Sequence, residues 1–70
     1  MRLAEFSRLV ESEFGAAHGR WLLSTHVLST LGVTADEAID RGDDVREVWW
    51  ALCRDNDIPQ DRWLGPDLAD

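Results

Sequence analysis

The chain of 70 residues carries 14 acidic side chains against 7 arginines, which gives a formal net charge of −7. Its length allows a single domain, and a hydrophobic fraction of 44% excludes a disordered acidic segment. One cysteine excludes an internal disulfide, so the four tryptophans are expected to supply the packing that a small core requires.

Apolar side chains recur at three- and four-residue steps along the first part of the chain. They predict a helix over about residues 3–14, which Gly15 ends. A second, central helix is predicted over about residues 16–31, with Gly32 at its end. Trp21 falls on the wide apolar face of this second helix, and we therefore expect Trp21 in the core.

Capping signals define two further helices in the second half of the chain. Thr34 and Glu37 have the spacing of a capping box and predict a third helix over about residues 35–41. Asp44 stands where an N-cap belongs and predicts a fourth helix over about residues 45–56. The stripe of apolar residues along this fourth helix indicates the face that packs on the core.

The end of the chain completes the expected architecture. Pro59 opens a short turn near residues 59–63, and no segment alternates as a strand would. The sequence therefore predicts an all-α class: a compact bundle of four helices with a short C-terminal turn. We expect a single domain over residues 1–64 and a flexible acidic tail over residues 65–70. No apolar run suits a signal core or a membrane span, and a lone cysteine suits a reducing compartment, so the expected location is cytoplasmic.

Six short motifs follow one another over about residues 1–60. They are Met1-Arg2-Leu3-x-Glu5-Phe6, Phe14-Gly15-x-Ala17, His26-Val27-Leu28, Thr34-x-x-Glu37-Ala38-Ile39-x-x-Gly42, Val48-Trp49-x-Ala51-Leu52-Cys53 and Ile58-Pro59. In this order and spacing they resemble a family of small actinobacterial proteins, domain of unknown function 3046. The resemblance implies a compact helical bundle, no established activity or cofactor, and genes near the strand-exchange recombinase of DNA repair. Trp50 departs from the family pattern, which usually has a polar residue there.

The residues that could carry chemistry do not form a catalytic or metal-binding set. The soft metal ligands are His18, His26 and Cys53, and the two histidines are eight residues apart, about 12 Å along a helix axis. Cys53 lies beside Trp49 on the apolar stripe of the fourth helix, which is typical of a core cysteine rather than a nucleophile. We therefore expect no catalytic residue, no metal, no cofactor and no enzymatic activity.

The acidic pairs have different interpretations. Asp43 and Asp44 stand at a helix start, where negative charge meets the positive end of the helix dipole. Asp55 and Asp57 stand near a helix end, where the sequence gives them no structural reason. The third and fourth helices have the length of a helix-turn-helix, but acidic residues outnumber arginines along them, which argues against direct binding to nucleic acid.

The strongest candidate for function is a partner surface on the fourth helix. Arg46, Trp50 and Arg54 are spaced four residues apart and share one face, opposite the apolar stripe. Two interpretations remain open for Trp50: it is the centre of an interface, or the C-terminal tail covers it while an arginine meets an acidic residue of that tail. Trp63 is also open to two interpretations: it anchors the tail, or it is an exposed contact for a partner. The acidic residues that the arginines would meet are Asp61, Asp67 and Asp70.

Two functional hypotheses follow. The first is a non-enzymatic cytoplasmic interaction or regulatory module, which binds an unidentified protein through Arg46, Trp50, Arg54 and Trp63. A marginal core with a spare tryptophan also favours a homodimer. The second is an acidic DNA mimic or a modulator of a DNA-repair protein, because residues 34–70 hold 11 acidic side chains and 4 arginines and thus the whole net charge.

Overall fold

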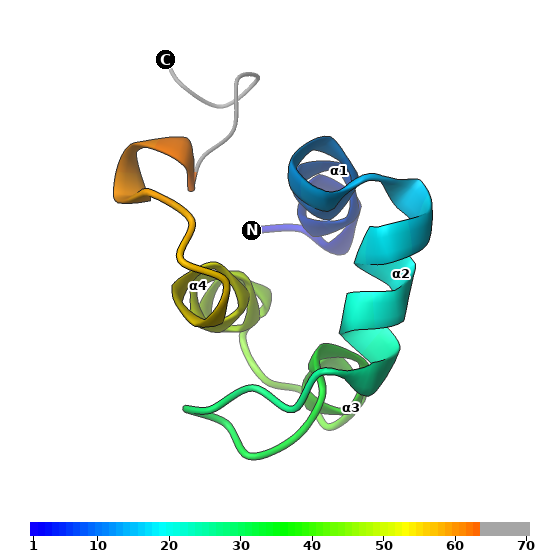
Figure 1. Cartoon of the computed structure of the whole chain (residues 1–70). Helices are drawn as coiled ribbons and strands as arrows, with labels where there is room; N and C mark the ends of the chain where they lie inside the picture. Colours follow the sequence, from blue (N-terminus) through cyan, green and yellow to red (C-terminus); the bar gives the residue numbers. More distant parts are fainter. Residues whose placement is uncertain (64–70) are drawn as a thin grey trace.

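The computed structural model describes residues 1–63, which form four α-helices followed by a short 3₁₀ turn (Figure 1). The elements are α1 (Leu3–Phe14), α2 (Ala16–Thr25), α3 (Ala35–Asp40), α4 (Val45–Asp55) and the 3₁₀ turn η1 (Gln60–Arg62). These residues contain no strand, only an isolated antiparallel bridge between Val27 and Thr34. The predicted all-α class is confirmed, with its four helices and C-terminal turn. The acidic tail predicted over residues 65–70 lies outside the described residues.

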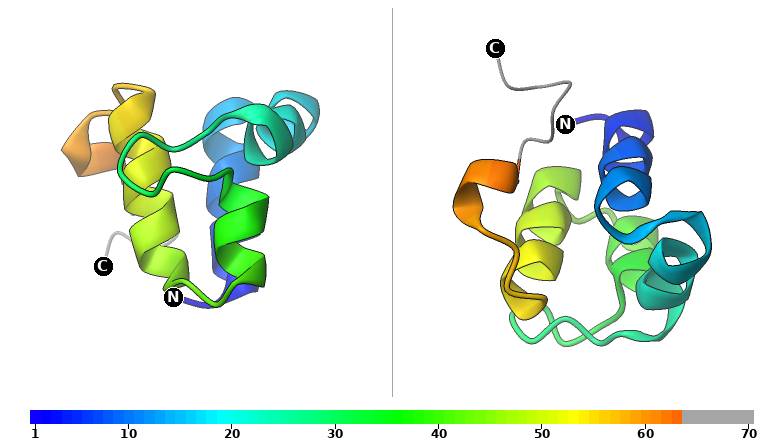
Figure 2. Two further views of the ribbon diagram at one scale, coloured as in Figure 1. Left: turned by 90° about the horizontal axis from the view of Figure 1, so that it is seen from below. Right: turned by 45° about the horizontal axis from the view of Figure 1, so that its top comes forward.

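Helix α2 lies across the direction of the others. In the view of Figure 1, α1 and α4 are seen nearly end-on, whereas α2 lies in the plane of the picture and leads from α1 to α3. Both α1 and α3 pack against α2 and against α4. The loop between α2 and α3 passes beneath α4 and reaches its C-terminal end (Figure 2). This arrangement brings residues of the loop next to residues that are about 26 positions further along the chain.

The core lies between α1, α3 and α4. Trp49 is 1% exposed and meets the ring of Phe6 edge to face, with the ring centroids 6.2 Å apart. The side chains that α3 contributes to this core are both alanines. The buried residues of this core are Phe6, Leu9 and Val10 from α1, Leu28 from the loop, Ala35 and Ala38 from α3, and Val48, Trp49, Ala51, Leu52 and Cys53 from α4. The predicted burial of Trp49 and Cys53 is confirmed.

The predicted caps of α3 and α4 are present. Thr34 Oγ1 accepts from the Glu37 amide at 3.2 Å, and the Glu37 carboxylate accepts from the Thr34 amide at 3.0 Å. These two hydrogen bonds complete the capping box, and the bond from the Thr34 backbone is the main reason that the pKa of Glu37 is lowered. Asp44 accepts from the Arg46 amide at 3.1 Å, and Gly42 has a φ of +95° after α3. The starts of both helices are therefore set locally.

Helix α2 is shorter than predicted, because it ends at Thr25 and not near residue 31. The Thr25 hydroxyl donates to the Trp21 carbonyl at 2.6 Å, and the Ser24 hydroxyl donates to the same carbonyl at 3.2 Å. Such bonds compete with the continuation of a helix. His26 is then extended, with φ −83° and ψ 116°, and the chain folds back so that the Leu28 amide donates to the carbonyl five residues later at 2.9 Å.

The predicted burial of Trp21 is wrong, since this side chain is 58% exposed. Gly19 and Leu22 are the buried residues of α2, and they lie on the other side of the helix. A Cβ atom on Gly19 would lie 2.7 Å from Val10 Cγ1, so the two backbones approach closely there. The sequence pattern pointed to the wrong face because glycine adds no hydrophobic signal where the helices touch.

Among the helices of residues 1–63, none combines the length and the apolar character that a membrane-spanning helix needs.

Candidate partner surface

Three of the four predicted surface residues share one face of α4. Arg46 and Arg54 are exposed and Trp50 is half-buried, whereas Val48 and Leu52 on the inner face are fully buried. The helix forms here because Asp44 caps its start and because one face of its sequence is apolar. The four-residue spacing therefore has the geometric effect that the sequence predicts.

The fourth residue, Trp63, joins this face from the C-terminal turn. Its ring lies 6.4 Å from the ring of Trp50, centroid to centroid, with an angle of 35° between the planes. The guanidinium carbon of Arg46 lies 6.0 Å from the centroid of Trp50, and that of Arg54 lies 5.9 Å from the centroid of Trp63. The four side chains form a continuous stack in the order Arg46, Trp50, Trp63 and Arg54, which we call the Arg–Trp surface.

Two hydrogen bonds hold Trp63 in place. Its indole Nε1 donates to the Ile58 carbonyl at 2.8 Å, and its own carbonyl accepts from the indole Nε1 of the buried Trp49. An ion pair between Arg62 and Glu13 ties the same turn to α1. These bonds fix the turn on the bundle, so that the Arg–Trp surface is built on a rigid support.

These contacts bear on the two interpretations of Trp50. The C-terminal segment does cover one side of Trp50, through Trp63, and both rings keep part of their surface exposed. Within residues 1–63 neither Arg46 nor Arg54 is in an ion pair, and Asp61 is not a partner of either. The proposed pairing with Asp67 or Asp70 lies outside the described residues.

The stack presents its two charges in a favourable geometry. Each guanidinium lies near the face of an indole ring, where the cation–π attraction contributes about 0.5–1 kcal/mol at an exposed site. A guanidinium has five N–H donors and no acceptor. A carboxylate that approaches the exposed edge of either arginine can accept two of these hydrogen bonds at once.

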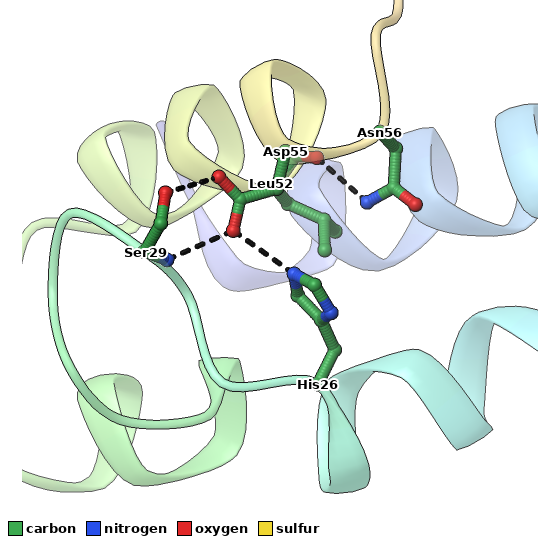
Figure 3. A network of polar contacts seen from close by, with 5 residues as sticks. All are labelled: His26, Ser29, Leu52, Asp55 and Asn56. Carbon is green, nitrogen blue, oxygen red and sulfur yellow. Dashed lines mark hydrogen bonds and ion pairs between the residues drawn. The ribbon is translucent and has the colours of Figure 1, made fainter.

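A second polar cluster was missed by the sequence analysis and lies between the α2–α3 loop and α4 (Figure 3). Asp55 Oδ1 accepts from the Ser29 hydroxyl at 2.5 Å. Asp55 Oδ2 accepts from the Ser29 amide at 2.8 Å and bonds to His26 Nε2 at 2.9 Å. Asn56 continues the network with a bond from its side-chain amide to the Leu52 carbonyl at 2.8 Å. The carboxylate that had no structural reason in the sequence thus anchors the loop.

This cluster contains serine, histidine and aspartate but not the arrangement of a catalytic triad. The Ser29 hydroxyl donates to Asp55, and His26 also bonds to Asp55, so no histidine stands ready to remove the serine proton. Burial by itself would raise the pKa of Asp55, but the hydrogen bonds from Ser29 and His26 outweigh burial and lower that pKa. The carboxylate is therefore held in its charged form, as a structural anchor requires.

A row of three rings that runs from the half-buried Phe14 on α1 to the exposed His18 and Trp21 on α2 was also missed. The ring of His18 stacks on Trp21, with centroids 5.7 Å apart and planes 18° apart. Phe14 meets the His18 ring edge to face, with the centroids 6.3 Å apart. The signal that could have located the row is the spacing of these residues, which places them within one or two turns of one another.

The remaining chemistry-bearing residues stand apart from one another. Cys53 is fully buried, and burial raises the pKa of its thiol to about 12, with the nearby Glu13 charge as a smaller cause. Among residues 1–63, no group of three or more histidine, cysteine, aspartate or glutamate side chains could hold a metal ion. His26 is hydrogen-bonded to Asp55 at the edge of the bundle.

Comparison with known proteins leaves the function open and identifies the family. Neither the curated proteins nor the solved structures contain a match to this chain. The model of one family, described as a protein of unknown function (DUF3046), matches residues 1–61. This match covers all four helices and most of η1, and the resemblance that the six motifs predicted is confirmed. The chain therefore belongs to the DUF3046 family.

Proposed function

We propose that this protein is a non-enzymatic interaction module that binds a partner protein through the Arg–Trp surface. The observation that carries the proposal is the continuous stack of Arg46, Trp50, Trp63 and Arg54 on a fixed support. Tryptophan and arginine are the side chains most enriched at the energetic centres of protein interfaces. Because the stack is formed in the free protein, a partner need not order these long side chains on binding, which lowers the cost of association.

The exposed chemistry of the surface suggests the kind of partner. Two guanidiniums flank a pair of half-buried indole rings, so the complementary surface has carboxylates around an apolar side chain. A protein with a net charge of −7 would attract an acidic partner only locally, through these arginines. We therefore expect slow association, because the net charges repel each other, and an affinity that depends on packing at the tryptophans.

The DNA-mimic hypothesis is the less favoured one. Several carboxylates of the acidic second half already serve the fold: Glu37 and Asp44 cap helices, Asp43 pairs with Arg41, and Asp55 anchors the loop. A mimic needs carboxylates that are free to meet a basic groove.

The cytoplasmic location also remains a proposal, which the single buried cysteine supports.

Quantitative affinity capture tests the proposal. The wild-type chain and a variant with Arg46→Glu and Arg54→Glu are used as baits in native lysate, and the captured proteins are compared by mass spectrometry. Both arginines are exposed, so the variant is expected to stay folded. A specific partner should bind the variant at least about 30-fold more weakly, the effect of losing about 2 kcal/mol at an interface centre.

A second variant controls for net charge. Arg2→Glu, Ala4→Glu and Ala17→Glu together make the same change of charge at exposed positions of α1, its N-cap and α2, away from the stack. Partners that both variants lose equally would be charge-driven and would contradict a role for the Arg–Trp surface.

Sedimentation of wild-type protein tests the homodimer: a dimer that Arg46→Glu and Arg54→Glu dissociate would make a second copy the partner.

A further inference from the structure

Two adjoining cavities form a groove on the side of the bundle that α1, α2 and α3 build. Their volumes are about 220 Å³ and 400 Å³, and Ser7, Leu23 and Asp36 line both of them. The groove follows α1 from Leu3 to Glu11, a rise of about 12 Å or about two helical turns. Among residues 1–63, none from α4 or η1 lines it, so the groove is separate from the Arg–Trp surface.

Part of the floor of this groove is apolar, mostly in the larger of the two cavities. Phe6 and Val10 line it but are only 1% and 3% exposed, so the apolar surface that a ligand can reach comes mainly from the half-buried Leu23 and Ile39. Leu3 is 52% exposed and continues the apolar surface at one end. A floor of this kind accommodates apolar side chains, and a length of two turns fits two or three anchors spaced along one face of a helix.

The rim of the groove is acidic. Glu11 on α1 and Asp36 and Asp40 on α3 line it, against a single cation, Arg20 on α2. Three carboxylates and one guanidinium give the rim a net charge of −2, and within residues 1–63 none of these carboxylates is in an ion pair. Free carboxylates beside an apolar floor favour a cationic partner and repel phosphate groups.

We propose that this groove docks a short amphipathic helix of a partner protein, with apolar residues on one face and arginine or lysine flanking them. The apolar anchors pack on Leu3, Leu23 and Ile39 in the larger cavity, and the basic side chains meet Asp36 and Asp40. Charge complementarity selects the basic flanks, and the two-turn length of the floor selects a helix over a single small molecule.

The groove and the Arg–Trp surface favour partners of opposite charge. The groove has an acidic rim, whereas the Arg–Trp surface has two arginines whose guanidiniums each keep an exposed edge. The groove and the Arg–Trp surface share no residue. In Figure 1 α4 and η1 lie on one side of the bundle, whereas α2 lies on the other side, next to α1 and α3. The protein can therefore bridge two partners, and either binding site can fail without the other.

Selection from a random peptide library tests the proposal on the full chain. A library of peptides of about 12 residues is selected for binding to the wild-type protein, and the best binders are titrated while the amide shifts are followed by NMR. The binders should carry arginine or lysine around leucine, isoleucine or phenylalanine at helical spacing. Their shifts should centre on Ser7, Leu23 and Asp36, and the combined Asp36→Asn and Asp40→Asn variant should bind at least about 10-fold more weakly.

Two further variants decide the outcome. Ser7→Phe fills the groove from an exposed position and should abolish binding, while Glu47→Gln with Asp57→Asn makes the same charge change as Asp36→Asn with Asp40→Asn, away from the groove, and should leave binding intact. Selected peptides that are acidic, that bind Ser7→Phe as well as the wild type, or that shift α4 and η1 would overturn the proposal. A dimer that Ser7→Phe dissociates would overturn it as well, since the occupant would then be a second copy.

Discussion

At the residue scale, one glycine sets the distance between the first two helices. Alanine at position 19 would place a methyl group 2.7 Å from Val10 Cγ1 and 3.5 Å from the Val10 carbonyl oxygen. Valine in a helix has one preferred rotamer, so it cannot turn away. We expect Gly19→Ala to lower the free energy of unfolding by about 1–3 kcal/mol, because the cost of overpacking exceeds the gain in helix propensity. Urea denaturation measures the change.

The partner residue supplies the control for this prediction. In a Val10→Ala background the clashing methyl group is absent, so Gly19→Ala should be neutral or stabilising there, by up to about 1 kcal/mol. Equal destabilisation in both backgrounds would contradict a direct clash between positions 10 and 19.

The single thiol reports on opening of the core. Cys53 is fully buried, and its pKa is raised to about 12, so almost none of it is thiolate at neutral pH. We expect iodoacetamide to modify Cys53 in the folded protein at least about 10³-fold more slowly than in urea, because reaction requires unfolding. Fast labelling of native protein would contradict this.

A raised pKa favours the folded state below pH 9.0, and this contribution is lost as the pH rises from there towards about 12.

At the element scale, the α2–α3 loop depends on a residue of another helix. Asp55 accepts two hydrogen bonds from Ser29 and bonds to His26, and no such partner is available within the loop. Asparagine at position 55 would place an amide donor against these donors. We expect Asp55→Asn to lower the free energy of unfolding by about 1–3 kcal/mol at neutral pH, measured by urea denaturation.

The pH dependence of this effect has a definite sign. The folded-state pKa of Asp55 is lowered, so its contribution is fully present above about pH 3.8 and is lost as the pH falls through the folded-state pKa. The difference between wild type and Asp55→Asn should therefore shrink in acid. Asp57→Asn is the control, because Asp57 is exposed and has φ +57°, which asparagine adopts readily. A similar loss in Asp57→Asn would contradict a specific anchor.

Local signals account for the elements that the sequence predicted well. The capping box at Thr34 and Glu37 and the Asp44 cap act over two or three residues, and the structure has both of them. The end of α2 was not predictable in this way. Helical periodicity continues beyond Thr25, and the bonds that hold Ser29 outside a helix come from Asp55, 26 residues away.

The sequence likewise predicts only part of the Arg–Trp surface. The shared face of Arg46, Trp50 and Arg54 follows from their spacing on one helix, which the sequence predicts. The stacking of Trp63 on Trp50 depends on how the turn after Ile58 folds back, and no local pattern encodes that contact. The groove residues come from three helices and could be recognised only after these helices are packed.

At the scale of the whole molecule, the four tryptophans have unequal roles. Trp49 is at the centre of the core, Trp50 and Trp63 cover each other beside α4, and Trp21 projects from α2. A domain of this size has a total stability of roughly 5–10 kcal/mol. A single tryptophan in the core can therefore account for about half of that stability, whereas an exposed one contributes little.

The ranking of Trp49, Trp63 and Trp21 is the most direct test of the fold. Trp49→Ala should lower the free energy of unfolding by about 3–5 kcal/mol, since it leaves a large cavity against Phe6. Trp63→Ala should cost about 2 kcal/mol through the lost ring contact with Trp50 and the lost bond to the Ile58 carbonyl. Trp21→Ala makes the same chemical change at a side chain that is 58% exposed and should cost less than about 1 kcal/mol. Urea titrations of the three variants give the order, and a Trp21→Ala loss equal to that of Trp63→Ala would contradict this placement of α2.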